Sequence, residues 1–302
     1  MQKKYLFIFF LACLFILPGP GLAGGKGSRT IGEAFDGEEL VYDIGFWLFD
    51  RVAVGELRIE RSETGEYVAS LTAYTTGMVD RILQHRKDIY VSLLQSVDGG
   101  KRFMSKAFIK TVDINGKVRQ GITELDYEKG LMTWSSWGGG KADRTGTESF
   151  PPGTYIDDPL AAFYNFRFGV YGPVEDGREY RILTFPKKGR IPEIYARLAT
   201  SDEMTKRVPP EKAHARYLAD AKIDKELFGS GSGWVEILFD KELVPVEAVA
   251  KDIAFFGDVR GRLAGQVSGA GIGGGPGGQG PGAPLQGSPG FLLMEKGKVT
   301  KD

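Results

Sequence analysis

The chain has very few residues for metal or thiol chemistry. Its 302 residues include one cysteine, Cys13, and two histidines, His85 and His214. A zinc site normally needs three or four His, Cys or carboxylate ligands, and the two histidines lie far apart without a nearby acid-rich pattern. Because we expect Cys13 to be removed with an N-terminal leader, the mature chain would have no disulfides and no thiol chemistry. We therefore expect no bound metal and no cofactor.

Excess charge and long apolar runs are also missing. Lysine and arginine number 39, and so do aspartate and glutamate, so no basic excess points to nucleic acid as a partner. After residue 23, no stretch approaches the roughly 20 apolar residues that a membrane-spanning helix needs. We therefore expect a soluble mature chain without a transmembrane span.

The first 23 residues have the pattern of a secretory signal peptide. Two lysines precede the apolar segment 5–17, and small residues follow at Gly21 and Ala23. Positive charge, an apolar core and small residues occur in this order before a signal cleavage site. A lipoprotein would begin at an acylated Cys13, but the apolar core continues past that position. We expect cleavage after Ala23 and a periplasmic or otherwise extracytoplasmic protein.

Most of the remaining chain has the alternating pattern of β-strands. Turn residues such as Asn115-Gly116, which tolerate positive φ, separate many of these segments and favour tight hairpins. The predicted strands span residues 39–47, 51–60, 67–76, 88–95, 102–113, 121–127, 131–137, 178–185, 190–199, 215–225, 233–240, 244–256 and 259–263. This pattern predicts a mainly β fold, a curved antiparallel sheet or half-open β-barrel wrapped around one short central helix. We expect residues 24–264 to form this single domain.

Three segments between the predicted strands are not expected to form strands. Residues 77–85 have the apolar spacing of a short helical turn. Residues 138–147 begin with three glycines and are interpreted as an open loop. Residues 201–213 are polar, contain two adjacent prolines and are interpreted as a connection.

The central helix is predicted from its start signal. The Asp158 side chain can accept hydrogen bonds from the amides of the first turn, and Pro159 suits the first helical position. Asp157 also lies near the positive end of the helix dipole. Leu160 and Phe163 follow at helical spacing, and the rest of the surface is nearly as apolar, which is typical of a buried helix. These five residues form the predicted structural motif.

Residues 265–302 are expected to form a disordered tail. They consist largely of Gly, Pro, Gln, Ala and Ser up to residue 290, which provides too little apolar surface to offset the entropy of ordering. The apolar group 291–294 could be a tethered binding peptide or a frayed terminus.

No arrangement of catalytic residues is predicted. Asp157 and Asp158 could form a carboxylate pair for acid–base chemistry, but capping of the helix explains them more simply. The run Gly138-Gly-Gly-Lys141 resembles a phosphate-binding loop only superficially, because Ser135 and Ala142 occupy required glycine and hydroxyl positions. We expect a protein that is not an enzyme.

Three motifs give the chain a family resemblance. They are Gly37-Glu38-Glu39-Leu40-Val41-Tyr42-Asp43 followed by Val54-Gly55, the run from Asp158 to Arg167, and the run from Trp234 to Asp240 followed by Val244-Pro245-Val246. Together they make residues 35–264 resemble a bacterial envelope family known as domain of unknown function 3108. The resemblance implies an extracytoplasmic, β-rich protein without an established activity.

Two functions are compatible with these features. In the first, an apolar groove of the curved sheet binds a hydrophobic ligand or a lipidated partner, with Tyr164, Phe166 and Arg167 as groove contacts. Burial of Arg167 at the helix end would alternatively make it a structural clamp, paired with a carboxylate or with exposed backbone carbonyls. In the second, the protein is an interaction or assembly module of the cell envelope, with residues 265–302 reaching a partner protein.

Overall fold

The structure is a computed structural model that describes residues 29–46, 49–222, 233–253 and 257–267. The chain divides into two units, residues 1–271 and 272–302, and every described residue belongs to the first. The predicted signal peptide and residues 268–302 of the predicted tail lie outside the described residues.

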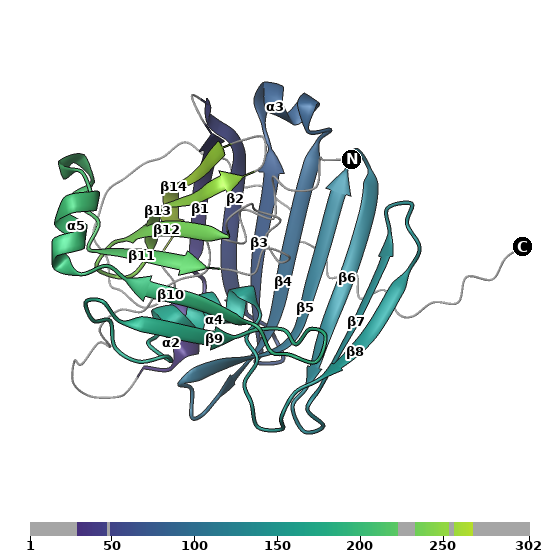
Figure 1. Cartoon of the computed structure of the whole chain (residues 1–302). Coiled ribbons are helices and arrows are strands. Elements are labelled where there is room, and N and C mark those ends of the chain that lie inside the picture. The colour runs from purple at the N-terminus through teal and green to yellow at the C-terminus, as the bar shows by residue number, and fades with distance from the viewer. Residues whose placement is uncertain (1–28, 47–48, 223–232, 254–256, 268–302) are drawn as a thin grey trace, which may run out of the picture. The chain divides into compact units, whose positions relative to one another are not determined.

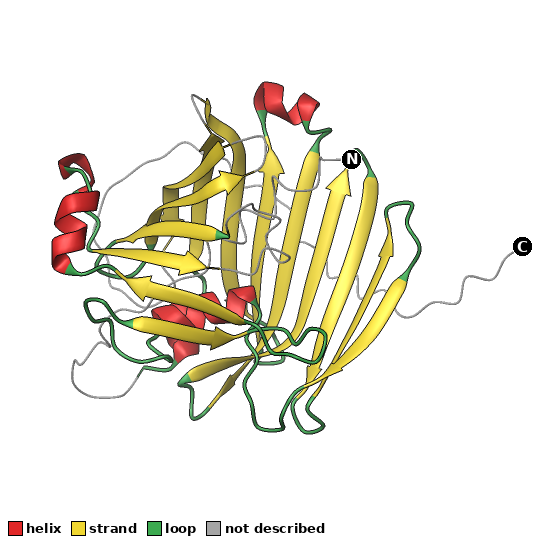
Figure 2. Ribbon diagram, in the orientation of Figure 1, coloured by secondary structure: helices red, strands yellow, loops and turns green. Residues whose placement is uncertain are grey.

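One antiparallel sheet contains all the strands of the described segments (Figures 1 and 2). Its first half is a meander of β1 (Glu39–Phe46), β2 (Phe49–Arg61), β3 (Tyr67–Thr75), β4 (Arg86–Val97), β5 (Arg102–Ile114), β6 (Lys117–Asp126), β7 (Leu131–Gly138) and β8 (Arg144–Ser149). The second half contains β9 (Glu179–Leu183), β10 (Glu193–Leu198), β11 (Tyr217–Lys222), β12 (Trp234–Phe239), β13 (Pro245–Ile253) and β14 (Gly257–Val267). Pairing of β1 with β14 joins the two halves. Strands β8 and β9 form the two edges, so the sheet is not closed into a barrel, and the predicted mainly β fold is confirmed.

Within the described residues, four short α-helices and one 3₁₀ turn accompany the sheet; Figure 2 shows the helices in red. They are α2 (Ile31–Phe35), α3 (Gly77–Ile82), α4 (Pro159–Arg167), α5 (Ser201–Arg207) and η1 (Pro210–Lys212). Helix α4 lies in the connection between the two edge strands, and each of its residues is buried. The structure therefore confirms a buried central helix, as expected from its nearly uniform apolar surface.

Alternating side chains explain how the strands pack. In β3, buried positions alternate with half-buried ones along the whole strand, because successive side chains of a strand point to opposite faces. Tight turns join many neighbouring strands; in the turn between β5 and β6, Asn115 and Gly116 have φ angles of 54° and 76°. Positive φ at both positions is what a tight two-residue hairpin requires.

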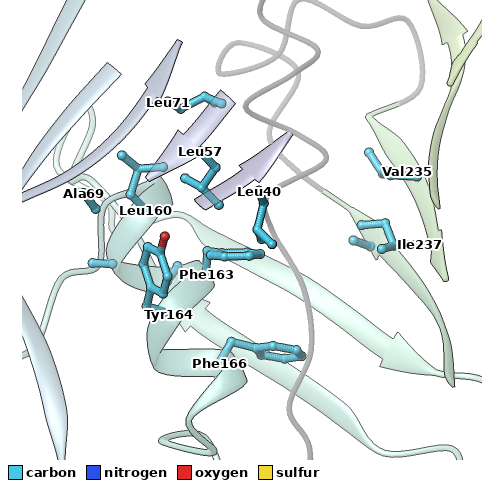
Figure 3. Packing of buried hydrophobic residues seen from close by; sticks show 14 of the residues in the cluster. Leu40, Leu57, Ala69, Leu71, Leu160, Phe163, Tyr164, Phe166, Val235 and Ile237 are labelled. Atoms are coloured by element: carbon cyan, nitrogen blue, oxygen red, sulfur yellow. The ribbon is translucent and has the colours of Figure 1, made fainter. Parts of the chain in front are cut away.

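The main core lies between α4 and the sheet. Leu160, Phe163 and Phe166 extend from the helix among residues that include Leu40 of β1 and Ile237 of β12 (Figure 3). The three helical side chains have no solvent exposure. Burial of each contributes roughly 1.5–3 kcal/mol, so the helix holds strands from both halves of the sheet to one core.

Two segments between predicted strands contain regular structure that was not predicted. Residues 201–207 form α5, whose N-cap Thr200 accepts a hydrogen bond from the amide of Glu203 while the Glu203 carboxylate accepts one from the amide of Thr200. This capping box is a recognisable helix start, so the predicted connection between two strands contains a helix that was not predicted.

The second correction concerns residues 138–147, where the structure places the start of β8. Gly146 lies opposite Trp134 of β7, and a Cβ atom at position 146 would lie 2.6 Å from the indole ring. The glycine therefore leaves room for the Trp134 ring across the strand pair. At the other end of the domain, β14 continues to Val267, past the predicted tail boundary at residue 265.

Candidate functional site

The predicted helix motif anchors the start of α4 to the sheet. The Asp158 carboxylate accepts hydrogen bonds from the amides of Leu160 and Ala161, at 2.7 and 3.0 Å, which confirms the predicted N-cap. The hydroxyls of Ser92 in β4 and Ser105 in β5 donate to its other oxygen. Burial raises the pKa of Asp158 to about 6, although these four hydrogen bonds oppose the shift. The cap therefore also ties the helix start to two strands.

Asp157 has a separate set of partners. Its carboxylate accepts hydrogen bonds from Arg102 at 2.5 Å, Tyr171 at 2.6 Å and Asn165 at 3.1 Å. The amide group of Asn165 also exchanges two hydrogen bonds of 2.8 Å with the backbone of Phe103 in β5. This network satisfies polar groups that the helix buries against the sheet, so Asp157 helps to hold the helix on β5.

Arg167 forms a buried ion pair at the end of α4. Its guanidinium donates to both carboxylate oxygens of Glu38, at 2.5 and 2.8 Å, and lies 4.8 Å from the ring centroid of Phe35. Tyr164 and Phe166 are fully buried in the same core. The structure thus places the three predicted groove contacts in the packed interior, and Arg167 has the geometry of the structural clamp.

A hollow of about 600 Å³ lies elsewhere on the sheet, and we call it the basic pocket. Its lining comes from the start of β4, from β5 and β6, from β7 and from the connection that follows β7. The lining residues are Gln84, Arg86, Lys110, Val112, Ile114, Asn115, Lys117, Arg119, Gln120, Gly121, Ser136, Gly139 and Lys141. Ligand pockets commonly have volumes of about 300–1,000 Å³, so this hollow is large enough for an organic ligand.

Strand register explains why basic and apolar side chains meet there. Ile114 of β5 lies opposite both Arg86 and Lys117, and Val112 lies opposite Arg119. Residues directly opposite one another in a sheet point to the same face. In β4 this face is also that of Ser92, which binds the helix cap, so the basic pocket opens on the face of the sheet that carries α4.

The five basic residues of the pocket differ in how their charges are balanced. Arg86 is buried and pairs with the buried Asp88, with an N–O distance of 3.0 Å. Lys110 has no carboxylate within ion-pair distance among the described residues, and its amino group lies 5.3 Å from the ring centroid of Tyr90. Burial lowers the pKa of Lys110, Asp88 opposes this effect and Arg86 adds to it. An incoming anion would therefore supply a charge that this amine lacks.

The lining limits the chemistry of the pocket. It provides arginine and lysine side chains beside Val112, Ile114 and the aliphatic stems of the basic residues, and among the described lining residues there is no carboxylate, histidine or cysteine. The arrangement suits binding of a molecule with one anionic group and an apolar body.

A second hollow is less suitable for a ligand. It measures about 200 Å³ and is lined by three aspartates, two arginines, Gly45 and two phenylalanines. Arg262 already contacts Asp50 at 3.4 Å, so part of the charge within this hollow is already paired. The described residues contain no cluster of three or more potential metal ligands, and none of their helices is long and apolar enough to cross a membrane.

Sequence reasoning missed the basic pocket. The run that ends at Lys141 was compared with a phosphate loop and rejected as such, yet Gly139 and Lys141 line the pocket. The available signal was a set of basic and apolar residues at every second position of two neighbouring segments, at 110, 112 and 114 and at 117 and 119. The two sets share one face of the sheet only once the β5–β6 hairpin is known.

Comparison with known proteins adds no identification. No family model, no curated protein and no solved structure matches the chain. The resemblance to domain of unknown function 3108 therefore stays a prediction from three sequence motifs.

Proposed function

We propose that this chain is a non-enzymatic, extracytoplasmic protein that binds an apolar ligand with an anionic group in the basic pocket. The ligand is a fatty acid, a lipid with an acidic headgroup or the acyl chain of a lipidated partner. The anionic group pairs with Lys110 and its basic neighbours, and the apolar body contacts Val112 and Ile114.

The observation that carries the proposal is the partly buried Lys110 inside a hollow of about 600 Å³. Its charge faces Arg86 as well as Asp88, and the Arg86 charge already has Asp88 as its partner. A hydrogen bond to a charged group contributes about 1.5–3 kcal/mol. An anionic ligand should accordingly bind at least about tenfold more tightly than a neutral analogue of the same length, since 1.4 kcal/mol corresponds to a factor of ten.

The experiment is a calorimetric titration of the delipidated protein with palmitate and with monopalmitoylglycerol. Lys110→Met removes the charge at similar volume, and Gly121→Leu fills the pocket from β6. Residue 121 has no positive φ, and the nearest atom to an added Cβ is the carbonyl oxygen of Ser135 at 3.3 Å. This contact is tight and requires the neighbouring backbone to shift by a few tenths of an ångström, so circular dichroism must show that the variant is folded. We expect Lys110→Met to abolish the preference for palmitate and Gly121→Leu to abolish binding of both compounds.

Matched control variants distinguish the effect of changes inside the pocket from the effect of changes elsewhere on the surface. Lys87→Met removes a charge from the opposite face of β4, and Thr133→Leu adds an apolar side chain at an exposed position of β7. Both should bind palmitate like the unmodified chain. Unchanged palmitate binding by folded Lys110→Met and Gly121→Leu proteins would refute the proposal.

The alternative role as an envelope interaction module depends on residues 265–302, most of which lie outside the described residues. It predicts that deletion of residues 268–302 removes a binding partner and leaves palmitate binding and the melting temperature unchanged. The deletion leaves β14 intact.

A further inference from the structure

One end of the meander β1–β8 collects several connections between strands. Because neighbouring strands are antiparallel, the β3–β4, β5–β6 and β7–β8 connections all lie at the same end. The first of these contains α3, which is seen at the top of Figure 1. The basic pocket reaches this end, since Gln84, Asn115 and Lys141 from the three connections contribute to its lining. We call this end of the sheet the pocket rim.

The pocket rim exposes apolar side chains. Met78 and Ile82 of α3 are 81% and 62% exposed, the two largest values among the exposed large hydrophobic residues of the described segments. They are four residues apart and therefore lie on the same face of the helix. Val118 and Trp137, near the other two connections, are also exposed. Exposed apolar groups gathered at one end of a domain mark an interaction surface.

The same end carries an excess of positive charge. Residues 77–88, 110–120 and 136–146 contain eight basic and four acidic side chains, whereas the whole chain is balanced at 39 of each. Asp88 pairs with Arg86, which leaves seven basic and three acidic side chains. Asp80 bonds to His85, and Asp113 accepts from the amide of Gly116, but neither hydrogen bond removes a negative charge. The charge that remains at the rim is therefore mainly positive.

We propose that the pocket rim docks on a lipid bilayer with anionic headgroups. Met78 and Ile82 insert at the boundary between headgroups and acyl chains, while Arg81 and the basic residues of the connections face the headgroup phosphates. Apolar side chains combined with basic ones are the features by which peripheral proteins bind anionic membranes. A neutral membrane would satisfy only the apolar part of this surface, so the charge at the rim selects the anionic bilayer.

Membrane docking at the rim would bring the bilayer close to the basic pocket. A membrane seated there would lie beside the end of the basic pocket that Gln84, Asn115 and Lys141 line, so an amphiphile could pass between bilayer and pocket over a short distance. The docking surface itself does not depend on the proposed ligand, because Met78, Arg81 and Ile82 do not line the pocket.

The test is cosedimentation of the full mature chain with extruded vesicles of phosphatidylcholine, with and without phosphatidylglycerol, at low and high salt. We expect binding to the anionic vesicles that weakens at high salt and little binding to the neutral ones. The affinity of the double variant Met78→Ser/Ile82→Ser for anionic vesicles should fall by about tenfold or more, because the variant loses two inserted apolar side chains. Arg81→Gln should bind about fivefold more weakly.

Control variants lie at the opposite end of the sheet. Val267→Ser removes a side chain that is 59% exposed, and Lys101→Gln removes an exposed charge from the β4–β5 turn; both should bind vesicles normally. The Gly121→Leu protein should lose palmitate binding and keep vesicle binding, which separates this proposal from the proposed function. Failure of the unmodified chain to bind anionic vesicles, or equal binding by the α3 double variant, would overturn the inference.

Discussion

The ion pair between Arg167 and Glu38 allows a quantitative test of how α4 is held in the core. Both residues are buried, at 8% and 6% exposure, and the guanidinium donates to both carboxylate oxygens. Arg167→Met would leave the Glu38 carboxylate buried without its cation. Removal of one partner of a buried pair costs about 3–5 kcal/mol, so we expect a loss of this size in the free energy of unfolding, and a similar loss for Glu38→Leu.

The double variant Glu38→Leu/Arg167→Met should behave differently. It removes both charges together, and replacement of a buried pair by apolar residues is often close to neutral. The Arg167 guanidinium lies 4.8 and 5.1 Å from the ring centroids of Phe35 and Phe163, so an apolar side chain at position 167 has aromatic neighbours to contact. The double variant should therefore be more stable than either single variant.

Urea unfolding of the four proteins, followed by circular dichroism at neutral pH, completes the double-mutant cycle. The coupling free energy should reach several kcal/mol and should persist at high salt, because buried pairs are screened little. Additive single-variant losses, or losses below about 1 kcal/mol, would show that the pair is not a clamp.

Three further predictions concern stability. Because burial raises the pKa of Asp158 from 3.8 to about 6, its protonated form is favoured in the folded state, and its contribution to stability grows as pH falls from 7 to 4, by up to about 3 kcal/mol. The unfolding free energies of the wild type and Asp158→Asn, measured by urea titration, should diverge by this amount over that pH range. A difference that stays constant with pH would contradict the raised pKa of Asp158. Thr200→Ala removes the cap of α5 and should cost about 1 kcal/mol of unfolding free energy, measured by urea titration. Gly32→Ala should lower the melting temperature, since its Cβ would lie 2.0 Å from the Tyr67 hydroxyl oxygen, whereas Gly265→Ala meets only an ordinary contact of 3.9 Å and should be neutral; equal melting temperatures would contradict the packing.

Local sequence signals account for much of the fold. Asp158-Pro159 predicts where α4 begins, because an N-cap side chain and a missing amide act within one turn of helix. Alternation within β3 predicts its buried face for the same reason, since only neighbouring residues are involved. The capping box of Thr200 and Glu203 was equally local and was overlooked beside the adjacent prolines, so α5 was readable from the sequence as well.

The sites depend on positions far apart in the chain. An apolar helix such as α4 can line a groove or fill a core, and only the tertiary structure decided that Tyr164 and Phe166 are fully enclosed. Glu38 reaches Arg167 across 129 positions of the sequence, a pairing that no local pattern encodes.

The sequence by itself determined the mainly β composition, the start of the central helix and the scarcity of histidine and cysteine, because each depends on residue types or on neighbours within a few positions. The tertiary structure alone decided the pairing of β1 with β14, the open sheet edges and the basic pocket. These features arise from strand register and sheet curvature. They bring Arg86, Lys110 and Lys141 together although more than twenty residues separate each from the next along the chain.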